Sequence, residues 1–228
     1  MFSRILRYAA AALLSTVAAG FIAAPAFAQS DQDKLVGAAE TSLSNFLRDP
    51  EMSWLQQNLS KAKALLIAPE VVKAGFIFGG SGGRALLVVR DPKSGLWMGP
   101  SFYNMATASV GFQAGVAVSE TITMVMTDKG FNSLLATSVK LGADASVAAG
   151  PVGAGAKSDV VADLIAFSRA KGVYGGLNLD GTVVTSADEW NQAFYGKKVL
   201  PPDILVRGDV KNAKADRLLA AVTKATAK

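Results

Sequence analysis

The residues of this chain that could do chemistry are carboxylates, lysines and hydroxyls, because the sequence contains neither histidine nor cysteine. Their absence removes the usual general base, the thiolate nucleophile, and the nitrogen and sulfur ligands of zinc, copper or haem. It also removes any disulfide framework. We therefore expect a protein without a cofactor and without a metal held by those ligands.

Glu120 stands out because it falls on the apolar face of an expected strand, together with Ile122 and Met124. A carboxylate on such a face must be paired, protonated or exposed at the mouth of a pocket. Lys140 and Asp144 share one face of the next expected strand and would approach Glu120 if the two strands paired. This predicts a buried polar site of Glu120, Lys140 and Asp144. An ion pair is the favoured interpretation, with a catalytic carboxylate pair or an oxygen-only calcium site as alternatives.

Two glycine-rich stretches are similar to catalytic motifs. Residues 79–83 (GGSGG) satisfy the G-x-S-x-G pattern of serine hydrolases, but that motif needs a following helix and a histidine. Residues 150–158 (GPVGAGAKS) come within one residue of a phosphate-binding loop, with Ala156 inserted before Lys157. We interpret both stretches as turns between strands.

Basic residues lie close in sequence to aromatic ones between Trp54 and Trp97. Basic groups beside exposed aromatic rings suit the head-group layer of an anionic membrane. Solvated lysines over core aromatic residues would explain the same pattern. The lipid-binding residues that the first interpretation predicts are Trp54, Lys61, Lys63, Lys73 and Arg84.

The elements that must position these residues are helices at the two ends and strands between them. Apolar spacings of three and four predict helices over 31–48 and about 52–62. Branched and aromatic runs bounded by turn residues predict strands, with Asp180-Gly181 as a tight hairpin turn. The expected strands are 65–67, 72–78, 85–90, 96–99, 109–127, 139–149, 164–170, 173–179 and 182–185.

The C-terminal part returns to helical periodicity. A short helix is expected near 131–136, and Ser186 with Glu189 predicts a capping box for a helix that ends at Tyr195. Residues 196–208 are expected to form a loop, followed by a final helix from about residue 210. That helix would carry a basic stripe of Lys214, Arg217, Lys224 and Lys228. The fold class predicted is α+β: an antiparallel sheet, open or closed into a barrel, with helices at both ends.

Residues 1–28 have the three parts of a cleavable signal peptide: Arg4 and Arg7, an apolar run over 8–24, and the A-x-A ending at Ala28. We expect an exported chain, periplasmic or secreted. Residues 29–228 would form one domain with a helical part over 31–62, a sheet-rich core over 64–195, and a C-terminal loop and helix over 196–228. Removing the two leader arginines from 23 basic residues leaves a net charge of +3 against 18 acidic residues, too weak for a nucleic-acid binder.

Several motifs in a fixed order make the chain similar to the SYLF-domain family. They are KAGFIFGGSGG over 73–83, WMGP over 97–100, GFQAG over 111–115, TDKG over 127–130, KLGADASVAAGPVG over 140–153 and SRAKGVYGG over 168–176. The resemblance covers about 58–203. Its departures are Glu120, where the family's aspartate is expected, and a first helix that is not notably basic.

The resemblance implies a non-catalytic lipid-binding module. Eukaryotic members of the family bind phosphoinositides, and some bind actin filaments. An exported protein would meet neither actin nor much phosphoinositide, so the implied ligand is an anionic phospholipid of the cell envelope. Two other functions fit the residues: a carboxylate-dependent envelope hydrolase using Glu120 or Asp144, and a structural or stress-related envelope protein that binds other proteins.

Overall fold

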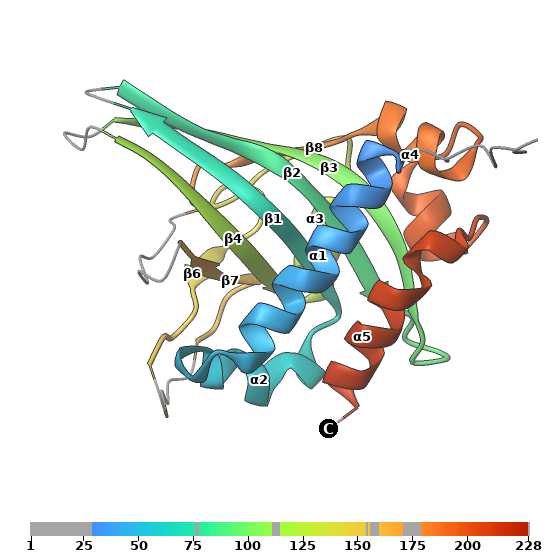
Figure 1. Cartoon of the computed structure of the whole chain (residues 1–228), viewed down its shortest axis with the longest axis horizontal. Helices are drawn as coiled ribbons and strands as arrows, with labels where there is room; N and C mark the ends of the chain where they lie inside the picture. The colour runs from blue at the N-terminus through green and yellow to red at the C-terminus, as the bar shows by residue number, and fades with distance from the viewer. Residues whose placement is uncertain are drawn as a thin grey trace, which may run out of the picture.

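The computed structural model describes residues 29–227 except 76–77, 111–114, 154, 156–159 and 171–178. The expected signal peptide, nearly all of the expected strand 173–179 and the end of the basic stripe at Lys228 therefore lie outside the described residues. A curled sheet carries α1 and α5 on one face and α3 on the other (Figure 1). The fold is α+β, as predicted: a half-barrel of mostly antiparallel strands with helices in the N- and C-terminal regions.

The N-terminal helix α1 (Asp31–Arg48) has the bounds that its periodicity predicts. Ser30 caps it, because its hydroxyl accepts from the Asp33 amide at 3.2 Å while the Asp33 carboxylate accepts from the Ser30 amide. A short 3-10 turn η1 (Pro50–Met52), the helix α2 (Ser53–Asn58) and a second 3-10 turn η2 (Leu59–Lys61) follow. The single expected helix over 52–62 is therefore three short pieces.

Long strands form the centre of the sheet: β1 (Ala64–Gly75), β2 (Phe78–Arg90), β3 (Trp97–Val110) and β4 (Gly115–Val125). The full order is β5-β8-β3-β2-β1-β4-β7-β6. Residues 79–83 belong to β2 and pair with both β1 and β3, so their expected role as a turn is wrong. A bulge in β1 after Ile67 explains Gly83, because a β-carbon there would overlap the Glu70 carbonyl oxygen.

The remaining strands are short, and they lie at the edges. The strand expected over 139–149 is two strands, β5 (Ser138–Lys140) and β6 (Val147–Ala149), at opposite edges of the sheet. β6 pairs in parallel with β7 (Leu164–Arg169), and parallel strands cannot be joined by the sharp turn that was expected after β6. Because only residues 141–146 join β5 to β6, the curled sheet brings its two edges near each other.

Helices complete the C-terminal part. The chain passes from β8 (Val183–Ser186) into α4 (Asp188–Tyr195), which lacks the predicted capping box. Its N-cap is Ala187, and the Ser186 hydroxyl donates to Asp188 instead. The expected loop contains a π-helical turn η3 (Asp203–Arg207). The final helix begins later than predicted, with a 3-10 turn η4 (Ala213–Ala215) leading into α5 (Asp216–Thr226).

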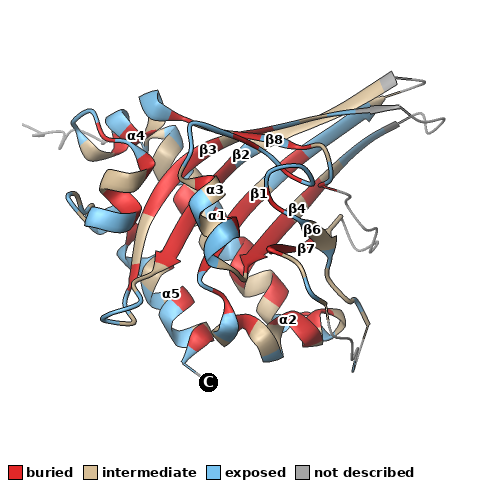
Figure 2. Ribbon diagram, turned by 180° about the vertical axis from the view of Figure 1, so that it is seen from behind, coloured by how far each residue is buried: buried red, intermediate tan, exposed pale blue. Residues whose placement is uncertain are grey.

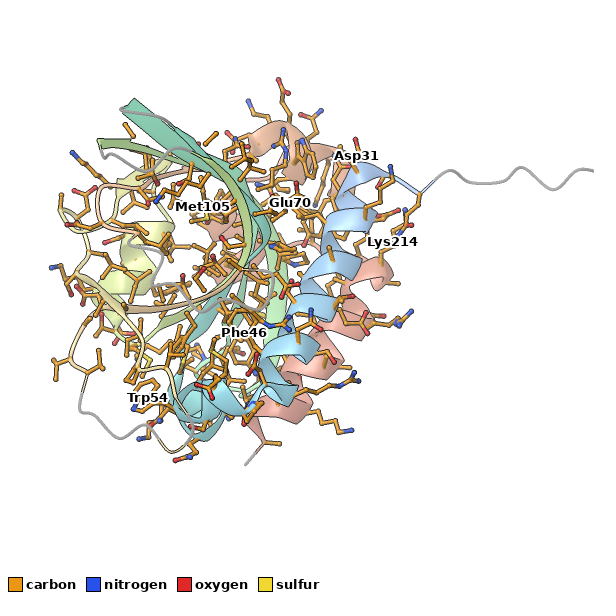
Figure 3. The ribbon with its side chains drawn as sticks, turned by 60° about the vertical axis from the view of Figure 1, so that its left-hand side comes forward. Asp31, Phe46, Trp54, Glu70, Met105 and Lys214 are labelled. Carbon is orange, nitrogen blue, oxygen red and sulfur yellow. The ribbon has the colours of Figure 1, made fainter. Side chains whose placement is uncertain are left out.

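Each face of the sheet has its own apolar core. Phe46 of α1 and Leu65 of β1 belong to the outer core, which α1, α2, α4 and α5 cover. Tyr103 and Met105 of β3 belong to the inner core, with Leu134 of α3 (Asp128–Leu134). Figure 3 shows the sheet nearly edge-on, with Phe46 and Met105 on opposite sides of it. Burying one such side chain contributes about 1.5–3 kcal/mol, so both faces stabilise the sheet where they are covered.

Asp163 fastens the segment that crosses between the sheet edges. Its carboxylate accepts from the Thr127 hydroxyl at 2.6 Å, and from the amide and the hydroxyl of Ser146 at 2.9 and 2.8 Å. Thr127 in turn caps α3 by accepting from the Gly130 amide. The Thr127 hydroxyl, followed by the Ser146 donors, lowers the pKa of Asp163 from 3.8 to about 2. The carboxylate therefore joins α3, the start of β6 and the start of β7.

Replacing Asp163 with asparagine should change how stability depends on pH. A pKa that is lowered in the folded state stabilises the fold above about pH 4, and this contribution is lost as pH falls from about 4 toward 2. We expect Asp163→Asn to be about 1–3 kcal/mol less stable at neutral pH and to lose less further stability on acidification. Urea unfolding between neutral and acid pH measures both effects. Asp128→Asn, in an exposed ion pair, is the matched control; equal acid dependence in wild type and Asp163→Asn would contradict the expectation.

Candidate functional site

The predicted basic cluster is close in sequence but not in space. Lys61 and Lys63 lie at one end of β1 and Lys73 near the other, about 30 Å away at ~3.3 Å per strand residue. Lys61 donates to the Asn58 side chain at 2.8 Å, and Lys63 forms an exposed ion pair with Asp128 at 2.8 Å. These lysines therefore do not form a single surface.

Trp54 is not presented at the surface either. It is 8% exposed and stacks on Phe167 of β7, with ring centroids 5.8 Å apart. Trp97 is also buried, and its indole donates to the Thr226 hydroxyl of α5 at 2.9 Å. Both rings belong to the outer core, so the core interpretation of these aromatic residues is the right one.

Arg84 joins the sheet to α4. Its guanidinium lies 3.9 Å from the centroid of the Trp190 ring and donates to the Asn104 side chain at 2.6 Å. A cation over an indole face contributes about 0.5–1 kcal/mol at an exposed position. Arg84 therefore has a structural role, and it lies on the outer face at the point where the helices stop covering the sheet.

Beyond that point the four long strands continue without a helical layer (Figure 1). We call this region the projecting sheet end: residues 72–75 of β1, 79–82 of β2, 106–108 of β3 and 116–118 of β4. Val116 is 75% exposed and Val72 is 38% exposed. Figure 2 shows the change from buried to exposed along the strands. Lys73 is exposed there, and it has no acidic partner within the described ranges.

Glu120 has partners other than those predicted. Its carboxylate accepts from the Asn45 amide group of α1 at 3.0 Å and lies 3.4 Å from the Arg169 guanidinium of β7. Arg169 also lies 3.1 Å from Asp49, whose side chain is 5% exposed. Asp49 begins η1 by accepting from the Glu51 amide at 3.1 Å. This Glu120–Arg169–Asp49 network fixes the end of α1 on the sheet.

Lys140 and Asp144 lie elsewhere. β4 pairs with β1 and β7, whereas Lys140 is on β5 at the edge beyond β8. The Lys140 backbone amide donates to the Asp144 carboxylate at 2.7 Å, which closes a local turn. The predicted site of Glu120, Lys140 and Asp144 is therefore wrong, and with it both the shared catalytic cleft and the calcium site.

The stretch 150–155 packs against the helices. The Gly153 amide donates to the Glu51 carbonyl at 2.9 Å, and the Ser53 hydroxyl donates to the Gly153 carbonyl at 3.1 Å. Lys157 lies outside the described residues. Gly150 leaves space for the ring of Phe167, which a β-carbon would overlap. These contacts give the described part of the stretch a packing role.

A groove that sequence reasoning did not find runs between α1 and α5. Its volume is about 410 Å³. Its lining residues are Glu40, Leu43, Ser44, Leu47, Arg48, Gln56, Ala221, Lys224 and Ala225. Lys224 was part of the predicted basic stripe, but nothing in the sequence indicated that Arg48 would lie in the same groove. Of the other stripe residues, Lys214 pairs with Asp33 and Arg217 pairs with Glu40.

A half-barrel sheet under a helical layer, with Glu120 and Asp49 in a structural network, defines an α+β domain. Residues 106–225 match the Ysc84 family, described as "Las17-binding protein actin regulator". The chain belongs to this Ysc84/SYLF family, which confirms the resemblance seen in its motifs.

The relatives are eukaryotic and longer. "LAS seventeen-binding protein 3" and "Protein YSC84" of Saccharomyces cerevisiae are each 34% identical over 145 residues, which is 60% of this chain and 31% of each relative. "SH3 domain-containing YSC84-like protein 1" of Homo sapiens is 30% identical over 165 residues, 70% of this chain and 48% of the relative. The chain thus spans about half or less of the relatives that it matches.

Replacing Arg169 with methionine tests the Glu120–Arg169–Asp49 network. The substitution keeps the length of the side chain but leaves the Asp49 and Glu120 carboxylates without this cation. Because Asp49 is buried, we expect a loss of about 2–4 kcal/mol in the free energy of unfolding, measured with urea. Lys63→Met, which breaks only the exposed pair with Asp128, should cost less than about 1 kcal/mol. Equal costs for the two variants would show that the network is not a stabilising feature.

Proposed function

We propose that this protein is a non-catalytic binding module that contacts the surface of an anionic phospholipid membrane through the projecting sheet end. The observation that carries the proposal is the exposure of Val72 and Val116 on one face of strands that no helix covers, with the exposed Lys73 projecting from the opposite face of the same strand end. Apolar side chains can enter the boundary between head groups and acyl chains while a lysine meets the lipid phosphates. Membership of the Ysc84/SYLF family supports a binding role.

The contact is peripheral. Within the described residues, no helix combines the length and the apolar character needed to cross a bilayer. A basic residue near an anionic surface contributes ~1 kcal/mol, and each buried methylene contributes ~0.8 kcal/mol. A lysine and two valines therefore support weak, reversible and salt-sensitive binding.

A protein ligand on the same sheet end is the second candidate, favoured by the description of the family as "Las17-binding protein actin regulator" and by the name of the yeast relative "LAS seventeen-binding protein 3". Those descriptions belong to longer proteins, of which this chain spans about half or less, and an exported chain would meet a different set of partners. A carboxylate hydrolase is not proposed, because Glu120 lies on β4, whereas Asp144 lies in the turn that follows β5.

We propose further that residues 1–28 direct export and are removed, so that the protein acts in the periplasm or outside the cell. N-terminal sequencing and mass measurement of the protein from its native host should give a chain that starts at Gln29. Ala26→Tyr together with Ala28→Tyr should block this cleavage, because the peptidase requires small residues at these positions. A protein recovered with Met1 in place, in the cytoplasmic fraction, would contradict the export proposal.

Vesicle cosedimentation tests the membrane contact. The protein should pellet with vesicles of phosphatidylglycerol and phosphatidylcholine, less with rising salt, and not with phosphatidylcholine alone. Lys73→Glu should weaken this binding by about ten- to thirtyfold, because reversing the charge changes the electrostatic free energy of membrane binding by ~2 kcal/mol. Val116→Asp should weaken it similarly.

Lys61→Glu is the matched control, since it makes the same charge change at the opposite end of β1. It should change binding by less than about threefold. Equal losses in Lys73→Glu and Lys61→Glu, or equal pelleting with neutral and anionic vesicles, would overturn the proposal. The second candidate would be favoured if the protein bound no vesicle but bound a purified envelope protein, and if Val116→Asp abolished that protein–protein binding.

A further inference from the structure

The groove between α1 and α5 exists because large residues on one helix face small ones on the other. The helices run side by side in the same direction, with Lys214 near the start of α5 paired to Asp33 near the start of α1. Figure 3 shows Lys214 beside the first turns of α1, where Asp31 is labelled. Further along, Ala221 and Ala225 share one face of α5, opposite Leu43 and Leu47 of α1. Two alanines cannot fill the space between the helices, which leaves an apolar trough.

The charges of the groove are unevenly distributed along it. Arg48 and Lys224 lie in the last turns of α1 and α5, so both are at the same end. Within the described part of the chain neither has an acidic partner. Glu40 lies two turns away along α1, about 12 Å at 1.5 Å per residue, and Arg217 engages it at 3.3 Å. The groove therefore has two cations at one end. Its apolar lining is Leu43, Leu47, Ala221 and Ala225, with Ser44 and Gln56 as neutral polar lining.

This arrangement matches an elongated ligand with one anionic end. We infer that the groove binds a single-chain anionic amphiphile, with its carboxylate or phosphate head group between Arg48 and Lys224 and its chain along Leu43, Leu47, Ala221 and Ala225. The volume of about 410 Å³ lies within the ~300–1,000 Å³ of small-molecule sites. The inference shares with the proposed function only the chemical class of the ligand, because the groove lies on the helical layer and the membrane contact on the projecting sheet end.

A simpler role for the two cations is to offset the negative ends of their helices, at about 0.3–1 kcal/mol each. That role acts on stability alone and does not depend on Ala221 or Ala225. Ligand binding, in contrast, depends both on the cations, which hold the head group, and on the alanines, which leave room for the chain. The two roles therefore give different results when charge and groove volume are changed separately.

Isothermal titration of the purified protein with monomeric amphiphiles, below their micelle-forming concentrations, tests the inference. Decanoate and dodecyl phosphate should bind with one site per chain. Dodecyltrimethylammonium, which has the same kind of chain and the opposite charge, should bind at least about tenfold more weakly. Inorganic phosphate should bind negligibly, since it lacks the chain. Equal binding of the cationic amphiphile, or of free phosphate, would overturn the inference.

Two variants separate the parts of the groove. The double variant Arg48→Glu, Lys224→Glu should bind dodecyl phosphate about tenfold more weakly. Ala225→Phe should abolish binding, because the phenyl ring fills the trough. The circular dichroism spectrum of each variant should match that of the wild type. Lys73→Glu, far from the groove, should bind normally. Unchanged affinity in Ala225→Phe would place the ligand elsewhere and refute the site. If the protein bound monomeric amphiphiles but did not cosediment with vesicles, only the membrane proposal would be refuted. If it cosedimented with vesicles but bound no monomeric amphiphile, only the groove proposal would be refuted.

Discussion

The sheet of this protein is longer than the helical layer that covers it. A strand of 14 residues such as β3 extends about 46 Å, whereas the 18 residues of α1 extend only about 27 Å. Where the layers overlap, leucine, isoleucine and phenylalanine fill both faces of the strands. Where they do not overlap, the strands change to glycine, alanine and scattered valines, because large apolar side chains there would have no partner. The two proposed binding surfaces follow from this mismatch and from how the helices pack on each other.

The helices were the more predictable part of the fold. Val36, Leu43 and Phe46 recur at helical spacing, and Asp49-Pro50 marks the end of α1. The central strands were harder because β3 is buried on both faces: Phe102 belongs to the outer core and Tyr103 to the inner one. Such a strand has no alternation of apolar and polar residues. The glycines of β2 then suggested a turn in the middle of a strand.

The candidate sites show where sequence reasoning ends. That Glu120 needs a polar partner follows from the cost of burying a charge, and the structure supplies one. That the partner is Arg169 depends on β4 pairing with β7, and no local pattern encodes that pairing. Likewise, Arg48 is an ordinary cation at a helix end until the tertiary packing of α5 places Lys224 in the same groove. Nearness in sequence did not predict nearness in space along the extended strand β1, because Lys63 and Lys73 lie near its opposite ends.

The shortness of the outermost strands has a consequence for solubility. An exposed strand edge offers unpaired amides and carbonyls to any other chain, and long flat edges are common starting points of aggregation. Here β5 and β6 are three residues each, and the segment that joins them passes from one side of the half-barrel to the other. A neighbouring molecule would find little backbone to pair with along β5 and β6 themselves. Two outermost strands of this length therefore limit edge-to-edge pairing at β5 and β6, in a sheet whose inner strands are long.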